Sequence, residues 1–434
     1  MDASLALLLS FAVLLLMGLP IATALGLAGM LGILLGLDSS ALATIGTNTY
    51  NGIAKYPLMA IPLFILTGMI FERSGVAAKL VDFASVVVGP RRGGLAVVAV
   101  LVCLLMGGMS GSGPADAAAV ATVMIPSMAK AGYPKSFSAG MIAAAASTAI
   151  LIPPSIALIV YSIMVPGLDL RALFAAGVGP GLLAGLSVIL PTLVLSAHYG
   201  FGRTEEAASP RPPFLKSLVG AIPGLMAPVI ILGGLRTGLF TPTEAAVVAV
   251  AYGLIVGLFV YRTLDFKGVY LALVESAQTS AVILIIMTFA GIFAWAGSTL
   301  GSFDMGAKAM FALSDNSIVA LLIVNGVLLL LGMVLDGISI YLITLPLLIP
   351  MMERFGWNGT WFGALMAMNI AIGQFTPPVA VNLMVTAKVA GVSIESTTRW
   401  VIWLVLAMGS ALLLTIAVPE IATWLPEWLG YAVD

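Results

Sequence analysis

Residues 107–155 read GGMSGSGPADAAAVATVMIPSMAKAGYPKSFSAGMIAAAASTAILIPPS, and two interruptions, Ser110–Asp116 and Ile152–Ser155, flank an apolar helical run within them. In lipid, an unpaired backbone N–H or C=O group is costly, so a break survives only where protein or a polar cavity satisfies it. Glycine, serine and proline favour such breaks. Freed carbonyl groups could hold a small hard cation and freed N–H groups an anion, so both interruptions are predicted to be binding elements.

The composition places this segment in a membrane. Of 434 residues, 61% are hydrophobic and 9% are charged, and the mean hydropathy is +1.15. A soluble domain needs more polar surface, so the predicted fold class is an all-α polytopic membrane protein surrounded by membrane lipid. The net charge of −1 gives no reason to expect a nucleic-acid partner. The single cysteine, Cys103, lies in an apolar run and is expected to be a buried, inert thiol.

The same pattern returns later in the chain at a constant offset. Pro126 aligns with Pro350 (350 − 126 = 224), and this shift aligns further residues without gaps. The aligned pairs include Gly108 with Gly332, Gly113 with Gly337, Gly132 with Gly356, Pro153 with Pro377, and Pro154 with Pro378. Chance similarity between apolar segments would fall on Leu and Val, whereas these matches fall on residues that set backbone geometry. The chain is therefore predicted to contain two structural repeats.

Short apolar runs beside the interruptions indicate re-entrant hairpins. The runs Leu95–Met106, Ala117–Met128 and Tyr341–Met352 are shorter than the roughly 20 residues that cross a bilayer. One hairpin is predicted with its tip at Ser110–Asp116, and a second with its tip near Asp336–Ser339. Each hairpin is expected to be followed by a helix that breaks at a double proline.

The predicted organisation has three parts. Residues 1–202 form the first repeat, with scaffold helices, the first hairpin and a broken helix at 152–155. Residues 203–216 form a polar linker. Residues 217–434 form the second repeat, with scaffold helices, hairpin 2 near 332–352 and a broken helix at 376–378.

Two further features concern the first repeat. Leu5–Leu37 is continuous and apolar, and it is expected to be one long membrane element kinked at Pro20. The basic residues Arg73, Lys79, Arg91 and Arg92 cluster in one predicted loop. The positive-inside rule places this loop in the cytoplasm.

Two acidic residues stand beside the hairpin tips. An ionisable group at membrane depth is costly, so Asp116 and Asp336 are functional candidates, although each could instead cap the start of a helix. Uncharged polar groups stand beside the same breaks, at Ser110, Ser112, Ser155, Thr376 and Asn382. Such hydroxyl groups often bond their own backbone, but their gathering at both interruptions favours binding. Glu244 follows Thr241 and Pro242 at capping-box spacing and is predicted to be structural.

The motifs GGMSGSGPAD, LIPPS, TPTEAA and FTPPVAVN occur together in this order. In these motifs, and over essentially its whole length, the chain resembles the large membrane subunit of the tripartite ATP-independent periplasmic (TRAP) transporters. The resemblance implies two inverted repeats and an elevator-type fold, with a mobile transport part and a scaffold part. It also implies a non-enzymatic importer of organic acids in the bacterial inner membrane. Its substrates would be C4-dicarboxylates, keto acids or sugar acids.

The same resemblance implies partners and sites. The partners are a small TRAP membrane subunit and a periplasmic substrate-binding protein, and two or more Na⁺ ions are co-transported. The residues expected at one sodium site are Ser110, Ala149, Ile152 and Pro154. Those expected at a second sodium site are Asp336, Gly373, Thr376 and Pro378. The residues expected to face the organic acid are Ser112, Asp116, Ser155 and Asn382.

Three other interpretations remain. A sodium-driven anion symporter could work without a binding protein. An intramembrane serine protease could use the Gly-Met-Ser-Gly sequence around Ser110, with His198 as the base. A purely structural membrane scaffold leaves the paired backbone interruptions unexplained.

Overall fold

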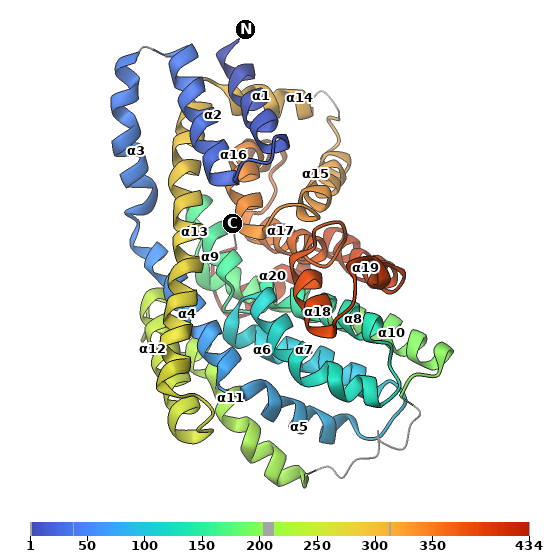
Figure 1. Ribbon diagram of the computed structural model, residues 1–434. Coiled ribbons are helices and arrows are strands. Elements are labelled where there is room, and N and C mark those ends of the chain that lie inside the picture. The colour runs from blue at the N-terminus through green and yellow to red at the C-terminus, as the bar shows by residue number, and fades with distance from the viewer. Residues whose placement is uncertain (1, 38, 203–211, 312–313, 434) are drawn as a thin grey trace.

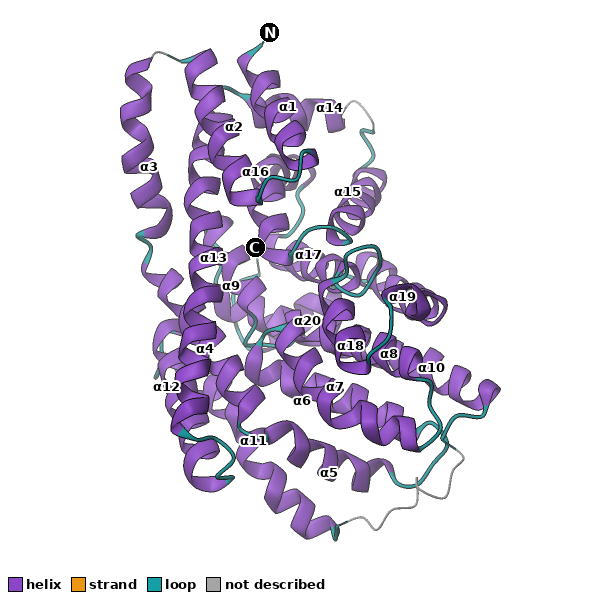
Figure 2. Ribbon diagram, in the orientation of Figure 1, coloured by secondary structure: helices purple, strands orange, loops and turns teal. Residues whose placement is uncertain are grey.

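The computed structural model describes residues 2–37, 39–202, 212–311 and 314–433, and these form helices and loops without a β-strand (Figure 2). The helices of the first half are α1 (Ala3–Leu16), α2 (Ile21–Gly36), η1 (Ser39–Ala43), α3 (Thr44–Ile53), η2 (Tyr56–Met59), α4 (Ala60–Arg73), α5 (Val76–Val88), α6 (Gly94–Ser110), α7 (Gly113–Lys130), α8 (Lys135–Ser147), η3 (Thr148–Ile150), α9 (Ile156–Met164) and α10 (Leu170–Tyr199). Those of the second half are α11 (Phe214–Arg236), α12 (Pro242–Ile255), η5 (Val256–Val260), α13 (Phe266–Thr299), α14 (Ser302–Phe311), α15 (Ser317–Gly332), α16 (Gly337–Phe355), α17 (Gly359–Gly373), α18 (Val381–Ala390), α19 (Ile394–Ala417) and α20 (Glu420–Trp428). Within the described residues, seven helical segments are long and apolar enough to cross a membrane.

The N-terminal segment is an antiparallel pair of helices, so the expectation of one element kinked at Pro20 is wrong. A methyl group added at Gly36 would lie 2.5 Å from the Cβ atom of Ala3, and one added at Gly32 would lie 2.7 Å from Leu7. The chain reverses between α1 and α2, where Gly18 has a φ of +83°. Only glycine adopts this backbone conformation at little cost, and that permits a full reversal in place of a kink.

An outer bundle forms one side of the molecule. The long helix α13 packs along α2, α3 and α4, as the left side of Figure 1 shows. Helix α12 packs on α4 and on α11. The hydroxyl groups of Tyr252 and Tyr261 donate to the carbonyl oxygens of Pro223 and Gly220, each at 2.6 Å, and thereby fix α12 and the following turn to α11. These helices form a frame against which the hairpins lie.

Both predicted hairpins are present, but the predicted tips extended too far, because Gly113–Asp116 and Gly337–Ser339 already belong to helices. Helices α6 and α7 meet at a tip formed by Gly111 and Ser112, and α15 and α16 meet at a tip formed by residues 333–336. After each hairpin a helix is interrupted. The first interruption separates α8 and η3 from α9 at residues 151–155, and the second separates α17 from α18 at residues 374–380. Each contains a cis double proline, Pro153–Pro154 and Pro377–Pro378.

The two repeats agree in the positions of their helices. Helix α7 begins at Gly113 and α16 at Gly337, which are the residues paired by the shift of 224 positions found in the sequence. The same shift carries the start of α8 onto the start of α17, and the start of α10 onto the start of α19. The shift found from glycine and proline positions therefore also relates the helix starts of the two repeats.

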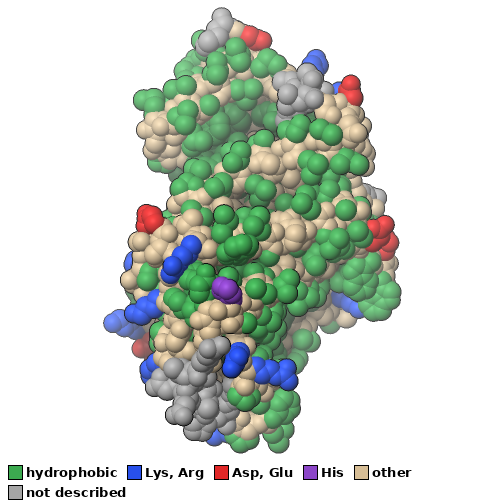
Figure 3. Space-filling view, turned by 90° about the vertical axis from the view of Figure 1, so that its right-hand side faces the viewer, with side chains coloured by type: hydrophobic (Ala, Val, Ile, Leu, Met, Phe, Trp, Pro, Cys, Tyr) green, Lys and Arg blue, Asp and Glu red, His purple; other side chains and the backbone are tan. Residues whose placement is uncertain are grey.

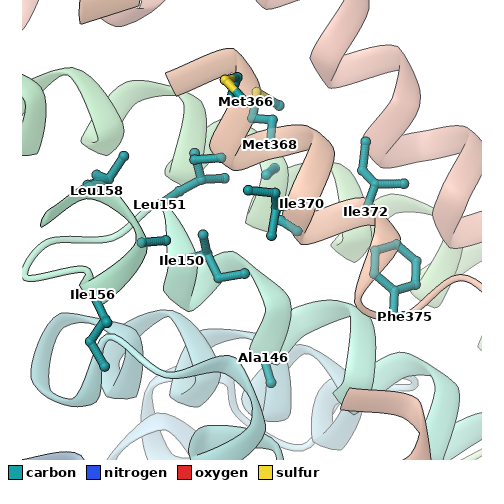
Figure 4. Close-up of a cluster of buried hydrophobic side chains, with 14 of the residues drawn as sticks. Ala146, Ile150, Leu151, Ile156, Leu158, Met366, Met368, Ile370, Ile372 and Phe375 are labelled. Atoms are coloured by element: carbon teal, nitrogen blue, oxygen red, sulfur yellow. The ribbon is translucent and has the colours of Figure 1, made fainter. Parts of the chain in front are cut away.

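The repeats interleave in space. Helices α7 and α8 pack against α18, while α10 packs against α17, α19 and α20. Ile150 and Ile156, which flank the first interruption, lie in one buried cluster with Ile370 and Ile372 of α17 (Figure 4). The two interruptions thus share a hydrophobic core.

Two other sequence predictions concern loops. The proposed linker, residues 203–216, falls largely outside the described residues, and α11 begins within it at Phe214. The predicted basic loop contains helix α5, so Lys79 is helical. The capping box is confirmed: the Glu244 N–H donates to the Thr241 hydroxyl at 3.3 Å, and the Glu244 carboxylate accepts from the Thr241 N–H at 2.8 Å.

The surface agrees with a lipid environment. Figure 3 shows hydrophobic side chains spread over much of one face, with most basic side chains gathered in its lower part. Large apolar residues are exposed on several helices, among them Leu186 and Leu190 of α10 and Leu406 of α19. A soluble protein rarely exposes so much apolar surface, so this face is suited to contact with acyl chains.

Candidate functional site

The two hairpin tips meet at one cavity of about 460 Å³, a size typical of small-molecule sites. The outer bundle closes it with residues from α4 and α13. The lining residues are Ile65, Gly68, Met69, Gly111, Ser112, Gly113, Pro114, Ala115, Ile150, Ile156, Ala157, Thr279, Val282, Ile283, Ile286, Asp336, Gly337, Ile338, Ile370 and Gln374. Both repeats therefore contribute to a single site.

The first tip is held against the first interruption. Gly111 has a φ of +59°, and a methyl group added there would lie 2.3 Å from the carbonyl oxygen of Pro154. The Ser110 hydroxyl donates to Asp116 Oδ1 at 2.7 Å and accepts from the Ser112 N–H at 3.1 Å. Asp116 is completely buried, and its Oδ2 atom has no hydrogen-bond partner among the described residues. The carboxylate of Asp116 thus organises the tip from behind the cavity.

The start of α7 faces the cavity through Gly113, Pro114 and Ala115. Ser112 occupies the N-cap position, but none of the described side chains caps this helix end. The first N–H groups of a helix lack partners within the helix and carry the positive end of its dipole. The first tip therefore presents a site that suits an anion.

The second tip differs, because its helix end is already occupied. Asp336 caps α16 by accepting from the N–H groups of Ile338 and Ser339, each at 3.1 Å, and it also accepts from the Ser339 hydroxyl. The Val379 N–H donates to the carbonyl oxygen of Met333 at 3.1 Å, which ties the tip to the second interruption. The sequence left open whether Asp336 is functional or caps a helix. The structure shows that Asp336 caps α16 and also lines the cavity.

Two side-chain amides lie against the first tip, one from Gln374 of the second interruption and one from Asn382 at the start of α18. A methyl group added at Gly113 would lie 2.8 Å from Gln374 Oε1 and 2.8 Å from Asn382 Nδ2. Both amide groups are buried, and these atoms have no hydrogen-bond partner among the described residues. Buried polar groups usually have partners, so their position beside a helix N-terminus favours a polar ligand here.

The remaining predicted side chains do not line the cavity. Ser155 is fully buried. Its hydroxyl caps α9 by accepting from the Leu158 N–H at 3.3 Å and donates to the carbonyl oxygen of Ile150, so its hydrogen-bonding capacity is used within the protein. The Thr376 hydroxyl donates to the Ile372 carbonyl oxygen at 2.6 Å. Of the substrate-facing residues predicted from the sequence, Ser112 lines the cavity, whereas Asp116, Ser155 and Asn382 do not.

The proposed cation positions lie at close backbone contacts. In the first repeat, a methyl group added at Gly107 would lie 2.8 Å from the Cα atom of Ala149. In the second repeat, one added at Gly373 would lie 2.4 Å from the Cα atom of Gly332. The six backbone positions assigned to the two sodium sites, Ala149, Ile152, Pro154, Gly373, Thr376 and Pro378, all fall at or beside the interruptions. The backbone next to each interruption thus packs directly against a helix of a hairpin.

Sequence reasoning missed Gln374, Thr279 and Gly68, all of which line the cavity. Gln374 precedes the Phe-Thr-Pro-Pro motif, and the repeat shift pairs it with Ile150. The replacement of an apolar residue in the first repeat by a polar one in the second could have identified Gln374 as a candidate site residue. Thr279 and Gly68 belong to the outer bundle and carry no comparable signal, because only the tertiary packing brings them to the tips.

We expect Ser110 and Asp116 to be energetically coupled. Ser110→Ala leaves a buried carboxylate oxygen without its donor, which should destabilise the protein by roughly 1–3 kcal/mol. In the Asp116→Ala background the same serine substitution should cost much less. A double-mutant cycle on thermal unfolding in detergent measures the coupling. Additive effects would show that the hydrogen bond does not organise the tip.

The protease interpretation is not supported by the geometry. The Ser110 hydroxyl is buried and donates to Asp116 rather than to a histidine. His198 is exposed in the last turn of α10, where its ring contacts Tyr199. A serine nucleophile needs a base within hydrogen-bond reach, and His198 is not a hydrogen-bond partner of Ser110.

Comparisons with known proteins agree with this architecture. Residues 8–421 match the family model described as the tripartite ATP-independent periplasmic transporter, DctM component. The chain is 38% identical over 411 residues to the C4-dicarboxylate TRAP transporter large permease protein DctM of Pseudomonas aeruginosa, with 94% of each chain covered. It is 36% identical over 414 residues to the isethionate TRAP transporter permease protein DctMQ of Oleidesulfovibrio alaskensis, covering 95% of this chain and 64% of that one.

A solved structure shares the fold. The YdaH transporter of Alcanivorax borkumensis, whose crystal structure was described as having an unusual topology, superposes with a TM-score of 0.63 at 17% identity. The match covers 99% of this chain and 98% of that one. Together with the helices that can span a membrane, these matches place the chain in a bacterial inner membrane as a multi-pass protein. The chain belongs to the DctM family of TRAP transporter large permeases.

Proposed function

We propose that this chain is the large membrane subunit of a sodium-coupled importer of small organic anions, supplied by a periplasmic binding protein. The observation that carries the proposal is the cavity between the two hairpin tips, with an uncapped helix end on one side and Asp336 on the other. Two relatives bear names that specify a C4-dicarboxylate and isethionate as substrates. Both substrates are small organic anions.

Recognition of the anion is assigned to the first tip. The cavity lining contains no lysine or arginine, so an anionic group must be bound by neutral donors. Pro114 has no N–H group, so the available polar groups are the N–H groups of Gly113 and Ala115 at the start of α7 and the side chains of Ser112, Thr279 and Gln374. Helix N-termini bind carboxylate and sulfonate groups in this way without a basic side chain.

Coupling to sodium is assigned to the two interruptions. Backbone carbonyl and hydroxyl oxygens suit a hard cation. One ion would lie near Ser110, Ala149, Ile152 and Pro154, and a second near Asp336, Gly373, Thr376 and Pro378. The carboxylate of Asp336 lines the substrate cavity as well, so a cation beside it would offset the charge of an incoming anion.

Alternating access is proposed to occur by movement of the hairpins against the outer bundle. The cavity lies between these two parts, since α4 and α13 line one side and the tips line the other. A methyl group added at Gly68 of α4 would lie 3.3 Å from the Cβ atom of Ser110, so α4 and the first tip pass close to each other. Small residues at such a contact allow helices to slide in an elevator-like motion.

The test is uptake into liposomes that contain this chain with its small membrane subunit. A labelled C4-dicarboxylate is supplied with its periplasmic binding protein, with and without an inward sodium gradient. Uptake that requires both the gradient and the binding protein is expected. Uptake that needs sodium but not the binding protein would indicate a simple symporter instead. Uptake that ignores the sodium gradient would refute the coupling.

A further inference from the structure

A second cavity of about 460 Å³ lies away from the hairpin tips, between α10, α11 and the C-terminal segment. Pro153 of the first interruption forms part of its wall. The lining residues are Pro153, Arg171, Phe174, Ala175, Val178, Pro228, Val229, Leu232, Gly233, Leu235, Arg236, Leu425, Trp428, Leu429 and Tyr431. None of these residues belongs to the substrate cavity, so we call this the C-terminal groove.

The three segments that form the groove meet at one face of the membrane. Helices α10 and α11 are consecutive membrane-spanning helices, so the start of α10 and the end of α11 lie on the same side. Helix α19 runs antiparallel to α10, because Trp400 near its start contacts Tyr199 at the end of α10, with ring centroids 5.2 Å apart. The end of α19, and the helix α20 that follows it, therefore lie beside the start of α10. The groove opens at that face.

Two arginines mark this opening. The Arg236 guanidinium lies 5.8 Å from the ring centroid of Trp428, and the Arg171 guanidinium lies 5.5 Å from that of Tyr431. Arg171 also forms an ion pair with Asp169 at 2.8 Å. Within the described part of the chain, Arg236 forms no ion pair, and the groove lining contains no acidic residue. Arg236 therefore presents a positive charge at the opening without an acidic partner among the described residues, whereas the charge of Arg171 is shared with Asp169.

The rest of the groove is apolar, and part of its wall is exposed. Apart from the two arginines, its lining consists of apolar and aromatic residues and Gly233. Val229 and Trp428 are well exposed, at 57% and 71% of their surface. A water-soluble anion would gain little from such walls. An acyl chain fits them. A phosphate group fits the guanidinium groups of Arg236 and Arg171, which line the groove beside aromatic rings of the kind that anchor proteins at membrane interfaces.

We propose that the C-terminal groove binds one anionic phospholipid, with its phosphate at Arg236 and Arg171 and an acyl chain lying along Val229 toward Pro153. A lipid with a zwitterionic headgroup would place a positive amine near the arginines and should bind less tightly. Because Pro153 belongs to the interruption that supports the first hairpin tip, the acyl chain would also brace that interruption. The site depends on the membrane location of the chain and not on its substrate.

Gly233 offers a way to fill the groove without disturbing the fold. A methyl group added at this position meets no atom within 4 Å. Gly233→Leu should therefore occupy the apolar part of the groove while both arginines remain. Gly409 of α19 also has open space around it and is outside the groove, so Gly409→Leu is the matched control.

The experiment uses native mass spectrometry of the delipidated chain with phosphatidylglycerol or phosphatidylcholine of identical acyl chains. The wild-type chain is expected to retain phosphatidylglycerol roughly tenfold more strongly, which is the order expected for two basic residues. Arg171→Gln with Arg236→Gln should abolish the preference, and Gly233→Leu should reduce retention of both lipids. Gly409→Leu should behave as wild type. Added phosphatidylglycerol should raise the unfolding temperature of the wild type but not of Gly233→Leu.

Three results would overturn the proposal. The first is equal retention of the two lipids by the wild type. The second is wild-type retention by Gly233→Leu. The third is displacement of the lipid by another occupant. Displacement by millimolar inorganic phosphate would assign the groove to a soluble anion, and displacement by the small membrane subunit would assign it to a subunit contact.

Discussion

Asp336→Asn is expected to reduce sodium-dependent uptake by roughly 10- to 100-fold, which corresponds to the loss of a charged partner in a partly buried site. Asparagine caps helices about as well as aspartate, so the bonds from the N–H groups of Ile338 and Ser339 should persist. The substitution therefore removes the negative charge from the cavity and preserves the backbone cap of the second tip, although the Ser339 hydroxyl can no longer donate to the second side-chain atom, which becomes an NH2 group. The loss should appear as a weaker dependence of uptake on sodium concentration.

The matched control for this experiment is Asp265→Asn. Asp265 caps α13 by accepting from the Gly268 N–H at 2.7 Å, and it does not line the cavity. Both variants should unfold near the wild-type temperature, and only Asp336→Asn should lose uptake. An Asp336→Asn protein with wild-type uptake and sodium dependence would exclude this carboxylate from coupling.

Gly111→Ala is expected to abolish transport and to lower the unfolding temperature. A side chain in the left-handed region costs roughly 1–2 kcal/mol, which accounts for part of the effect. The larger part is steric, because the added methyl group would lie 2.3 Å from the carbonyl oxygen of Pro154. The tip must then move away from the interruption, and the start of α7 moves with it.

Gly391→Ala separates these two contributions. Gly391 follows α18 with a φ of +66°, and a methyl group added there meets no atom within 4 Å. It should therefore show the backbone cost alone, with uptake preserved. If the two alanine variants lose the same stability and both transport normally, the contact between Gly111 and Pro154 has no functional importance.

The sequence was most informative where glycine and proline dictate the backbone. The double prolines at 153–154 and 377–378 located both interruptions, and the shift between them also relates the starts of α16, α17 and α19 to those of α7, α8 and α10. Such residues restrict the backbone whatever their surroundings. The same reasoning failed at Pro20. Gly18, two residues earlier, permits a reversal of the chain, and the sequence alone does not show whether the proline kink or the glycine turn will form.

Side-chain roles were harder to predict than the backbone. Asp116 and Asp336 occupy similar places in sequence, yet Asp116 is bonded to Ser110 behind the tip while Asp336 caps α16 at the cavity. Which carboxylate reaches the cavity depends on how the tips pack against the outer bundle. That packing joins residues far apart in the chain, and it also brings Thr279 and Gln374 to the site.

The charge of the cavity has an electrical consequence. Its lining holds one carboxylate, Asp336, and no basic side chain. Moving one elementary charge across a membrane costs or releases about 2.3 kcal/mol per 100 mV. Under the proposed mechanism, the empty cavity carries its negative charge outward when it returns. The membrane potential of a cell whose interior is negative favours this movement. With Asp336 counted as the one protein charge that moves, a cavity loaded with a dianion needs at least three monovalent cations to cross inward without opposing that voltage. The membrane potential itself would then select for multiple sodium ions per substrate.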